Sequence, residues 1–570
     1  MLIMLLLGAG WPTDGHDVRR TGQSEERGPA ELRWTGAVEL PEEVAVNMPP
    51  VATEAGVLVG SWGLTRSFGV EDRHEWDKAD GHLFSFDRAL SPNWEFSAEL
   101  VPWCYDYDGR TDTQCPDGGY WNRYNGTIEG TPAVSEGRVY VGRGDGKLYA
   151  VDEETGESIW TFTTFNPEDP ADPEGGGEII GGPLVGPDGA IYFGTAGVGL
   201  YKTNAIYALN PDGSLRWRYP SQTRGLDAIV WAPFALSPDG ATMYAATAWG
   251  ATVDDFDGNI QGCVFSFDVG AATGSGEERL RWTYTPINTD RWWQPTIWTR
   301  VLAVGSDGIL YFGGMEATFG GGTAVVYALE DQGDAAVGAW PTYVDVDYDR
   351  AQYLTGLALR EEGGLTRAVV ATSGDRYTAG SFGTGGLLQV MDPTDGAVQW
   401  SFNPEDYGAS GALSGVAIDA EGRLYTGAGG TVDSGGMVFA LDASGAVLWS
   451  FATEGMMAWA HPVLGPRGDL YFADFQECAL FGLPIEWGFC DNFDITPTLY
   501  AVFTSDPSEP VDTSEPDDSP TADDSSDDTS SNDTDDTGGP SKPGHCGCGG
   551  GAGSTGGLLG LLAALALRRR

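Results

Sequence analysis

Tryptophan recurs along this chain at a nearly constant interval. From the first to the last of eight such positions there are 415 residues over seven intervals, about 59 residues each. A fixed period of this length is typical of repeat architectures, in which each repeat is one supersecondary unit that must pack on its neighbours. The eight positions are Trp34, Trp94, Trp160, Trp217, Trp282, Trp340, Trp400 and Trp449.

Each repeat reads as four short apolar strands separated by turns, and the clearest copy is Gly130 to Thr164. Seven complete units can be counted. Trp34 lies in a strand with no preceding partners, and three more strands follow Trp449 without an eighth tryptophan after them. We therefore predict an all-β, eight-bladed β-propeller of four-stranded antiparallel blades, whose last blade is completed by the N-terminal strand. Such closure removes the open sheet edges of a long array.

The turns before several of these tryptophans have a recurring chemistry. Asp152, Gly156 and Trp160 illustrate it, because Asp favours a tight turn and Gly provides a positive φ. Asp392, Gly396 and Trp400 repeat this spacing, and Asp442, Gly445 and Trp449 do so with one residue fewer. The pattern resembles the tryptophan-docking motif of pyrroloquinoline-quinone (PQQ) repeat propellers, and Trp11 to Gly22 resembles the lead-in of these proteins. The resemblance covers residues 11–505 and implies that the eight tryptophans are structural docking residues.

That family includes quinoprotein dehydrogenases and the propeller lipoprotein of the outer-membrane β-barrel assembly machinery. For the enzymes, the resemblance requires two adjacent cysteines over the quinone and Glu, Asn and Asp ligands for calcium. No two cysteines are adjacent in this sequence, and it contains no HExxH, GxSxG or Walker motif. We therefore expect a protein that is not an enzyme and holds no PQQ, with a PQQ-dependent oxidoreductase as the alternative.

The net charge and the spacing of carboxylates indicate which classes of ligand, nucleic acid or metal ion, the chain can bind. With 31 Lys and Arg against 83 Asp and Glu, the formal net charge is -52, which excludes a general nucleic-acid binder. Calcium is the metal for which the sequence offers a candidate site, at Asp106, Asp108 and Asp112, because alternating carboxylates before a glycine can converge on one ion. The cluster lacks the later bidentate Glu of an EF-hand, and so acidic a composition also produces such clusters without a metal.

Insertions gather on one side of the expected propeller. If the strands of each blade are named A to D from the axis outward, the A–B and C–D turns share one rim, and the B–C and D–A connections share the other. The first set is minimal and the second is long, so we expect the ligand-binding face at the second rim. The long connections are Ser61 to Gly81, Val101 to Thr127, Ala248 to Gly262, Gly313 to Thr323, Gly374 to Gly386 and Asp474 to Asp494.

The connection from Val101 to Thr127 is rich in aromatic residues. These side chains could stack on a sugar, dock a protein, or pack the loop onto the propeller. We predict a disulfide between Cys104 and Cys115, another between Cys478 and Cys490, and a buried thiol at Cys263. The candidate binding residues are Trp103, Tyr105, Tyr107, Tyr120, Trp121 and Tyr124.

Both ends of the chain read as processing signals. Residues 1–10 resemble the apolar core of a signal peptide, and 506–543 is an acidic Asp/Ser/Thr/Pro linker with 13 acidic residues between Asp506 and Pro540. Residues 544–570 contain Cys546 and Cys548, a short apolar run and three terminal arginines, and resemble the MYXO-CTERM sorting tail. The resemblance implies cleavage near a cysteine and display at the cell surface or outer membrane, or secretion. We expect a monomeric propeller, anchored to the membrane through this tail, that binds an envelope or extracellular protein or a glycan.

Overall fold

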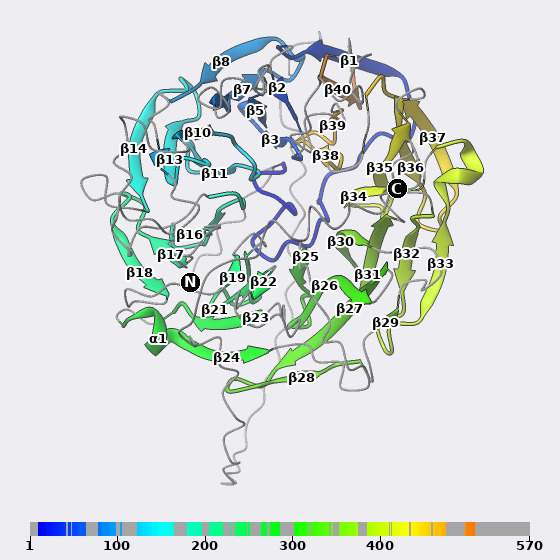
Figure 1. The fold of residues 1–570 in the computed structure, drawn as a ribbon. Coiled ribbons are helices and arrows are strands. Elements are labelled where there is room, and N and C mark those ends of the chain that lie inside the picture. Colours follow the sequence, from blue (N-terminus) through cyan, green and yellow to red (C-terminus); the bar gives the residue numbers. More distant parts are fainter. Residues whose placement is uncertain are drawn as a thin grey trace, which may run out of the picture.

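Each tryptophan-containing repeat folds into one antiparallel sheet, and eight such sheets form a ring around a central axis in the computed structural model (Figure 1). The eight-bladed propeller expected from the sequence is thus confirmed. The structure describes residues 10–41, 44–46, 48–63, 78–98, 103–104, 122–164, 179–195, 205–219, 228–229, 234–247, 249–250, 264–270, 274–284, 301–318, 321–340, 344–345, 353–373, 385–409, 411, 413–431, 435–455, 457, 460–474 and 496–507.

Blades 1 to 4 follow one another along the chain, and each runs from its innermost strand to its outermost. Blade 1 contains β3 (Val51–Thr53), β4 (Gly56–Gly60), β7 (Leu83–Phe86) and β8 (Pro92–Phe96). Blade 2 contains β11 (Ala133–Ser135), β12 (Arg138–Gly142), β13 (Lys147–Asp152) and β14 (Ser158–Thr163). Blade 3 contains β15 (Leu184–Val185), β16 (Ile191–Gly194), β17 (Ile206–Leu209) and β18 (Leu215–Tyr219). Blade 4 contains β20 (Phe234–Leu236), β21 (Thr242–Ala246), β23 (Val264–Asp268) and β24 (Leu280–Tyr284).

Blades 5 to 8 complete the ring. Blade 5 contains β25 (Val301–Val304), β26 (Ile309–Thr318), β27 (Gly321–Asp331) and β28 (Ala336–Gly338). Blade 6 contains β30 (Tyr353–Glu362), β31 (Leu365–Ser373), β32 (Leu388–Met391) and β33 (Val398–Phe402). Blade 7 contains β34 (Leu413–Ile418), β35 (Leu424–Thr431), β36 (Gly435–Leu441) and β37 (Val447–Ala452). Blade 8 contains β38 (Val463–Leu464), β39 (Leu470–Ala473), β40 (Thr498–Phe503) and β1 (Trp34–Glu39).

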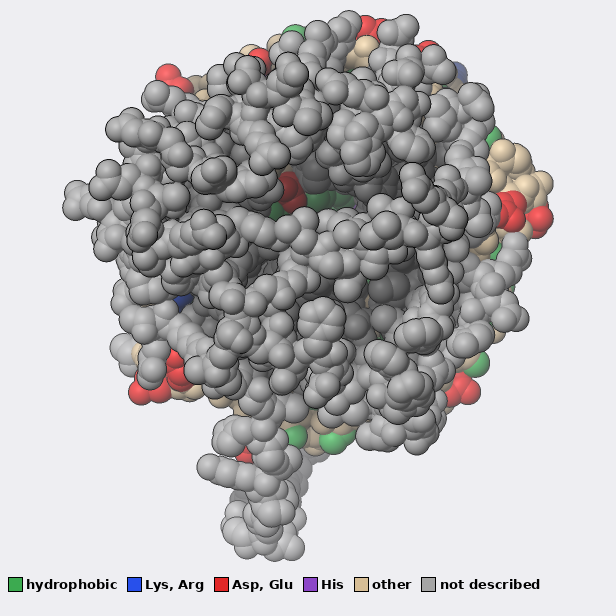
Figure 2. All heavy atoms as spheres, in the orientation of Figure 1, with side chains coloured by type: hydrophobic (Ala, Val, Ile, Leu, Met, Phe, Trp, Pro, Cys, Tyr) green, Lys and Arg blue, Asp and Glu red, His purple; other side chains and the backbone are tan. Residues whose placement is uncertain are grey.

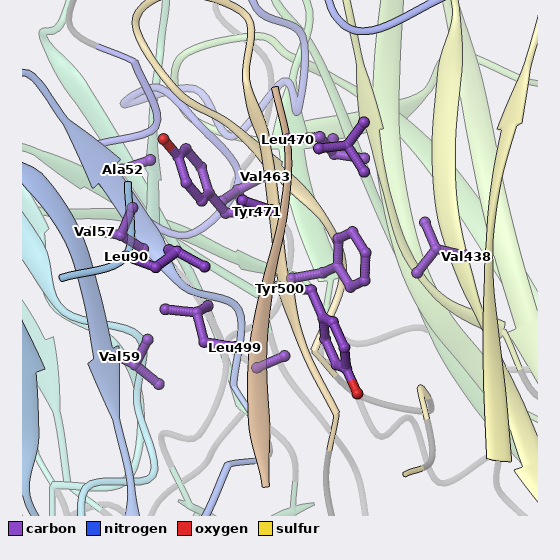
Figure 3. Close-up of a cluster of buried hydrophobic side chains, with 14 of the residues drawn as sticks. Ala52, Val57, Val59, Leu90, Val438, Val463, Leu470, Tyr471, Leu499 and Tyr500 are labelled. Carbon is purple, nitrogen blue, oxygen red and sulfur yellow. The ribbon is translucent and has the colours of Figure 1, made fainter. Parts of the chain in front are cut away.

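The ring closes where the N-terminal strand β1 pairs with β40 near the other end of the propeller. The two strands are antiparallel, from Trp34 opposite Phe503 to Glu39 opposite Thr498. Figure 3 shows β40 between its neighbours, with Leu499 directed toward Val59 of blade 1 and Tyr500 toward Val438 of blade 7. Blade 8 therefore buries both of its faces, and the predicted closure by the strand of Trp34 is confirmed.

The docking tryptophans link each blade to the next. A Cβ on Gly156, in the C–D turn of blade 2, would lie 2.7 Å from the Trp94 ring, and Trp94 Nε1 donates a hydrogen bond to Glu153 O at 2.9 Å. Trp160 packs in the same way on Gly213 of blade 3, and Trp400 on Gly445 of blade 7. This recurring contact requires a glycine both for its positive φ and for its missing side chain.

The docking contact differs at other junctions between blades. In blade 4 the short helix α1 (Gly276–Arg279) occupies the C–D connection, and the Arg279 guanidinium lies 5.8 Å from the centre of the Trp217 ring. At the closing blade, Trp449 Nε1 donates to Pro29 O at 2.9 Å, because the N-terminal segment replaces the missing C–D turn. One 3-10 helix, η1 (Pro404–Tyr407), lies between blades 6 and 7.

Candidate functional site

The two rims of the propeller differ in how much chain they carry. On the turn rim, the A–B connections contain two to five residues, as between β3 and β4 or β15 and β16. On the opposite rim, which we call the insertion rim, the connection from β39 to β40 contains 24 residues and that from β8 to β11 contains 36. The antiparallel order of strands places all B–C and D–A connections on the insertion rim, as predicted.

Short ladders join insertions of different connections into a second tier on this rim. Strand β10 (Asn122–Gly126) pairs in parallel with β6 (Lys78–Asp80) and antiparallel with β9 (Trp103–Cys104), so the B–C insertion of blade 1 is tied to the D–A insertion that follows it. Two further antiparallel pairs are β2 (Val44–Ala45) with β5 (Trp62–Gly63), and β19 (Ala228–Ile229) with β22 (Trp249–Gly250). The insertions are therefore hydrogen-bonded to one another and not only to the blades.

One expected insertion is regular structure. The segment Gly313 to Thr323 was expected to be a long loop, but β26 extends to Thr318 and β27 begins at Gly321. The two strands stay paired up to Thr318 opposite Gly321, so only a two-residue turn remains. Strand β29 (Val344–Asp345) pairs with β27, which places the Asp345 backbone in the sheet of blade 5. The loop expectation was wrong because these residues continue the ladder rather than leaving it.

Buried side-chain oxygens close the base of four B–C insertions in the same way. In each, the residue that follows the core of strand B accepts a hydrogen bond from the amide where strand C begins, and all four acceptors are 0% exposed. This supplies a partner for a backbone N–H group that the ladder no longer satisfies. The pairs are His82 N to Ser61 Oγ at 3.0 Å, Ala205 N to Thr195 Oγ1 at 2.9 Å, Leu387 N to Thr372 Oγ1 at 2.9 Å and Thr498 N to Asp474 Oδ1 at 2.7 Å.

Asp474 is the charged member of this set. Its carboxylate also accepts from Gly455 N at 2.8 Å and from the Tyr500 hydroxyl at 2.9 Å. Burial raises the pKa of Asp474 to about 6, although the hydrogen bonds act in the opposite direction. Sequence reasoning missed these four residues; the signal for them is a Ser, Thr or Asp directly after an apolar strand B that ends in Gly or Ala.

The opposite end of the axis is occupied by the N-terminal segment, residues 10–26, seen in Figure 1 as the dark blue trace across the middle of the ring. Its backbone carbonyls accept hydrogen bonds from the innermost strands of successive blades, and Trp11 is 0% exposed. These bonds run from Val134 N to Pro12 O (2.7 Å), Leu236 N to Val18 O (2.8 Å), Val304 N to Arg19 O (2.9 Å), Leu359 N to Thr21 O (2.6 Å) and Ile418 N to Gly22 O (2.8 Å). A sixth bond runs from Ala52 N in blade 1 to Trp11 O (3.0 Å), so the segment connects six blades at the turn rim.

Charged side chains in the N-terminal segment pair with one another or with blade residues. Arg20 Nη2 donates to Asp14 Oδ2 at 2.6 Å, and Arg19 Nη1 donates to Glu361 Oε1 at 2.8 Å. His461 lies 4.0 Å from Asp14, and burial lowers the pKa of His461 to about 4 despite that carboxylate. His461 is therefore neutral at physiological pH, and both arginines of this end already have carboxylate partners.

The sequence-predicted site residues fall into two groups. All eight docking tryptophans lie within the described chain, whereas for Trp103, Cys104 and Tyr124 only the backbone is described, in β9 and β10. Among the described residues, no group of three or more His, Cys, Asp or Glu side chains is arranged to hold a metal ion. The remaining candidates lie outside the described residues: Tyr105, Asp106, Tyr107, Asp108, Asp112, Cys115, Tyr120, Trp121, Cys263, Cys478, Cys490, Cys546 and Cys548, with the signal, linker and tail segments.

Figure 2 looks along the ring axis, and acidic and hydrophobic side chains of described residues are visible near its centre. Within the described ranges, no helix is long and apolar enough to cross a bilayer.

Comparisons with known proteins find similarity to PQQ-like β-propellers over part of the chain. The model of the family described as outer membrane protein assembly factor BamB matches residues 116–230, 144–261 and 384–471. Quinohemoprotein alcohol dehydrogenase ADH IIB of Pseudomonas putida is 26% identical over 134 residues, which are 20% of this chain and 19% of that protein. The match therefore spans about a fifth of that relative's length.

Solved structures share the fold at low sequence identity. A europium-containing methanol dehydrogenase superposes with a TM-score of 0.51 at 15% identity, covering 87% of this chain and 98% of that one. The quinohemoprotein alcohol dehydrogenase ADHIIG of Pseudomonas putida HK5 gives a TM-score of 0.50 at 15% identity, covering 90% and 82%. At this identity the likeness concerns the fold alone.

Proposed function

We propose that this protein is an exported, surface-anchored recognition or scaffold module, and that its partner binds at the insertion rim. The observation that carries the proposal is the asymmetry of the two rims. The long connections emerge together and are joined by ladders such as β6·β10·β9, whereas the turn rim has minimal turns and is covered at its axis by residues 10–26. Insertions that are held by a rigid scaffold are where recognition surfaces are usually found.

The proposed partner is an extracellular or envelope protein or a glycan. The insertion that contains β9 and β10 is rich in Trp and Tyr, which supply large contact area at a low cost in side-chain entropy. The strongly acidic composition makes a nucleic-acid partner unfavourable. Anchoring through residues 544–570 and extension by the acidic linker 506–543 are part of the same proposal.

The test compares variants of the two rims in one binding assay. The full chain is immobilised and probed with a glycan array and with envelope extract, beside a Trp103→Ala/Trp121→Ala variant and a turn-rim control, Glu136→Ala/Asp212→Ala, whose side chains are exposed. We expect the insertion-rim variant to lose binding and the control to keep it. Equal binding by all three proteins would contradict the proposed surface.

The alternative function is a PQQ-dependent oxidoreductase, and the observation that favours it is the match to ADH IIB. One feature weighs against it: the sequence lacks the two adjacent cysteines that the resemblance requires of the enzymes. Reconstitution with PQQ and calcium, followed by a quinone absorbance scan and dye-linked alcohol oxidation, decides between the two. Stoichiometric quinone binding with turnover would replace the recognition proposal.

A further inference from the structure

A fully buried arginine, Arg143, lies at the base of the connection between β8 and β11, which we call the aromatic insertion. Arg143 is 0% exposed and occupies the B–C turn of blade 2, between β12 and β13. Its Nη1 lies 3.3 Å from Asp145 Oδ2, and that same oxygen accepts a hydrogen bond from the Tyr149 hydroxyl at 2.8 Å. Burial raises the pKa of Asp145, although Arg143 counteracts the effect. A buried guanidinium and carboxylate are costly unless their hydrogen bonds are well satisfied.

The guanidinium reaches both ends of the insertion between β8 and β11. Arg143 Nε donates to Gly126 O at 2.9 Å, and Nη1 donates to Ala98 O at 3.3 Å. Ala98 directly precedes residues 99–125 of that insertion, and Gly126 is the last residue of β10. One planar, charged group therefore fixes the distance between the start and the end of a long insertion, a geometry for which Arg is better suited than Lys.

The turn that contains Arg143 does not need the guanidinium to close, because its backbone hydrogen bond closes it. The B–C connection of blade 2 contains four residues and closes through Arg143 N to Lys147 O at 3.0 Å. In four other blades the corresponding residue is Ser, Thr or Asp and bonds within its own B–C insertion. In blade 2 the side chain is instead directed at the neighbouring D–A insertion, whose base also receives Gly144 N to Thr127 O at 2.9 Å and Gly81 N to Gly126 O at 2.9 Å.

We propose that Arg143 is a positioning residue for recognition: it holds the β6·β10·β9 sheet in one orientation on the insertion rim. Asp145, which is itself held by the Tyr149 hydroxyl, orients the guanidinium. A pre-positioned insertion loses less entropy when a partner binds. The anchoring itself is independent of any partner, whereas its consequence for binding rests on the function proposed above.

The experiment measures local hydrogen exchange in the full chain with Arg143→Lys and with Arg143→Met/Asp145→Asn, which removes both buried charges together. Arg138→Met is the matched control, because Arg138 belongs to the same blade and donates to Pro211 O at 3.0 Å. We expect amides 122–127 to exchange about ten-fold faster in both Arg143 variants and to be unchanged in the control. Arg143→Lys keeps a cation beside Asp145 but cannot span Ala98 O and Gly126 O.

Unchanged exchange of amides 122–127 in Arg143→Lys would overturn the proposal, and so would a uniform acceleration over all blades, which indicates a general loss of stability. Binding in the glycan and envelope assay is measured on the same variants. Faster local exchange with weaker binding supports both the anchor and the recognition surface. Faster local exchange with undiminished binding supports the anchor and contradicts the proposed function of this insertion.

Discussion

The contact between Gly156 and Trp94 permits a quantitative test of what holds adjacent blades together. Gly156 has φ +73° and Gly137, at the A–B turn of the same blade, has φ +72°. A Cβ on Gly137 would meet nothing within 4 Å, whereas one on Gly156 would lie 2.7 Å from Trp94 Cδ2 and 2.8 Å from its Cε3. The two glycines therefore have nearly the same positive φ and differ in the tryptophan contact.

The expected cost follows from these two environments. Gly137→Ala introduces only the penalty of a side chain at positive φ, about 1 kcal/mol. Gly156→Ala adds an overpacking penalty of about 1–2 kcal/mol, since the indole must move by several tenths of an ångström. That movement also strains the bond from Trp94 Nε1 to Glu153 O, worth about 1 kcal/mol. We expect Gly156→Ala to lower the free energy of unfolding by about 3 kcal/mol.

The assay is urea unfolding followed by circular dichroism, because 20 tryptophans make fluorescence hard to assign. Both substitutions are also made in a Trp94→Leu background, which forms a double-mutant cycle. With the indole removed, Gly156→Ala should cost no more than Gly137→Ala. If the two substitutions cost the same with Trp94 present, the docking contact does not stabilise the junction between blades and the reasoning fails.

Four further predictions concern ring closure, the pH dependence of stability at two residues, and anchoring. Deleting residues 11–36 removes the first half of β1 and the axial segment, so the protein should aggregate or lose much of its thermal stability. A monomer with an unchanged Tm would contradict the closure. Burial lowers the pKa of His461 from 6.5 to about 4, so the unfolded chain binds the proton more tightly than the folded one. As the pH falls from about 6.5 to 4, the free energy of unfolding of wild type, measured in urea, should therefore decrease by up to about 3 kcal/mol relative to that of His461→Gln. Burial raises the pKa of Asp474 from 3.8 to about 6, so the folded chain binds the proton more tightly than the unfolded one. As the pH falls from about 6 to 4, the free energy of unfolding of wild type should therefore increase by up to about 3 kcal/mol relative to that of Asp474→Asn. If the unfolding free energy of either variant follows the same pH profile as wild type, the pKa shift of that residue is contradicted. Removing Gly556 to Arg570 should release the protein into the medium, and fractionation that still finds it on cells would contradict the proposed tail.

The number of blades and their closure could be predicted from the sequence because both depend on local, repeated signals. A tryptophan marks the outer strand of each blade, in several cases after an Asp- and Gly-containing turn. Counting the tryptophans shows that Trp34 lacks partners while the strands after Trp449 lack a tryptophan. Alternating apolar residues set the faces that pack between blades. The gathering of insertions on one rim follows from antiparallel strand order alone.

The tertiary structure decided the details in which distant segments meet. Six C–D pairings carry a register shift just before the docking tryptophan, as between Ala150 and Val151, and nothing in a single strand specifies it. The path of residues 10–26 along six blades is equally hidden, because it consists of backbone hydrogen bonds that almost any side chain permits. The reach of Arg143 to Ala98 and Gly126 also depends on how two insertions pack. Sequence patterns record periodicity and turn chemistry, whereas contacts between non-repeating segments depend on their arrangement in space, which only the folded ring defines.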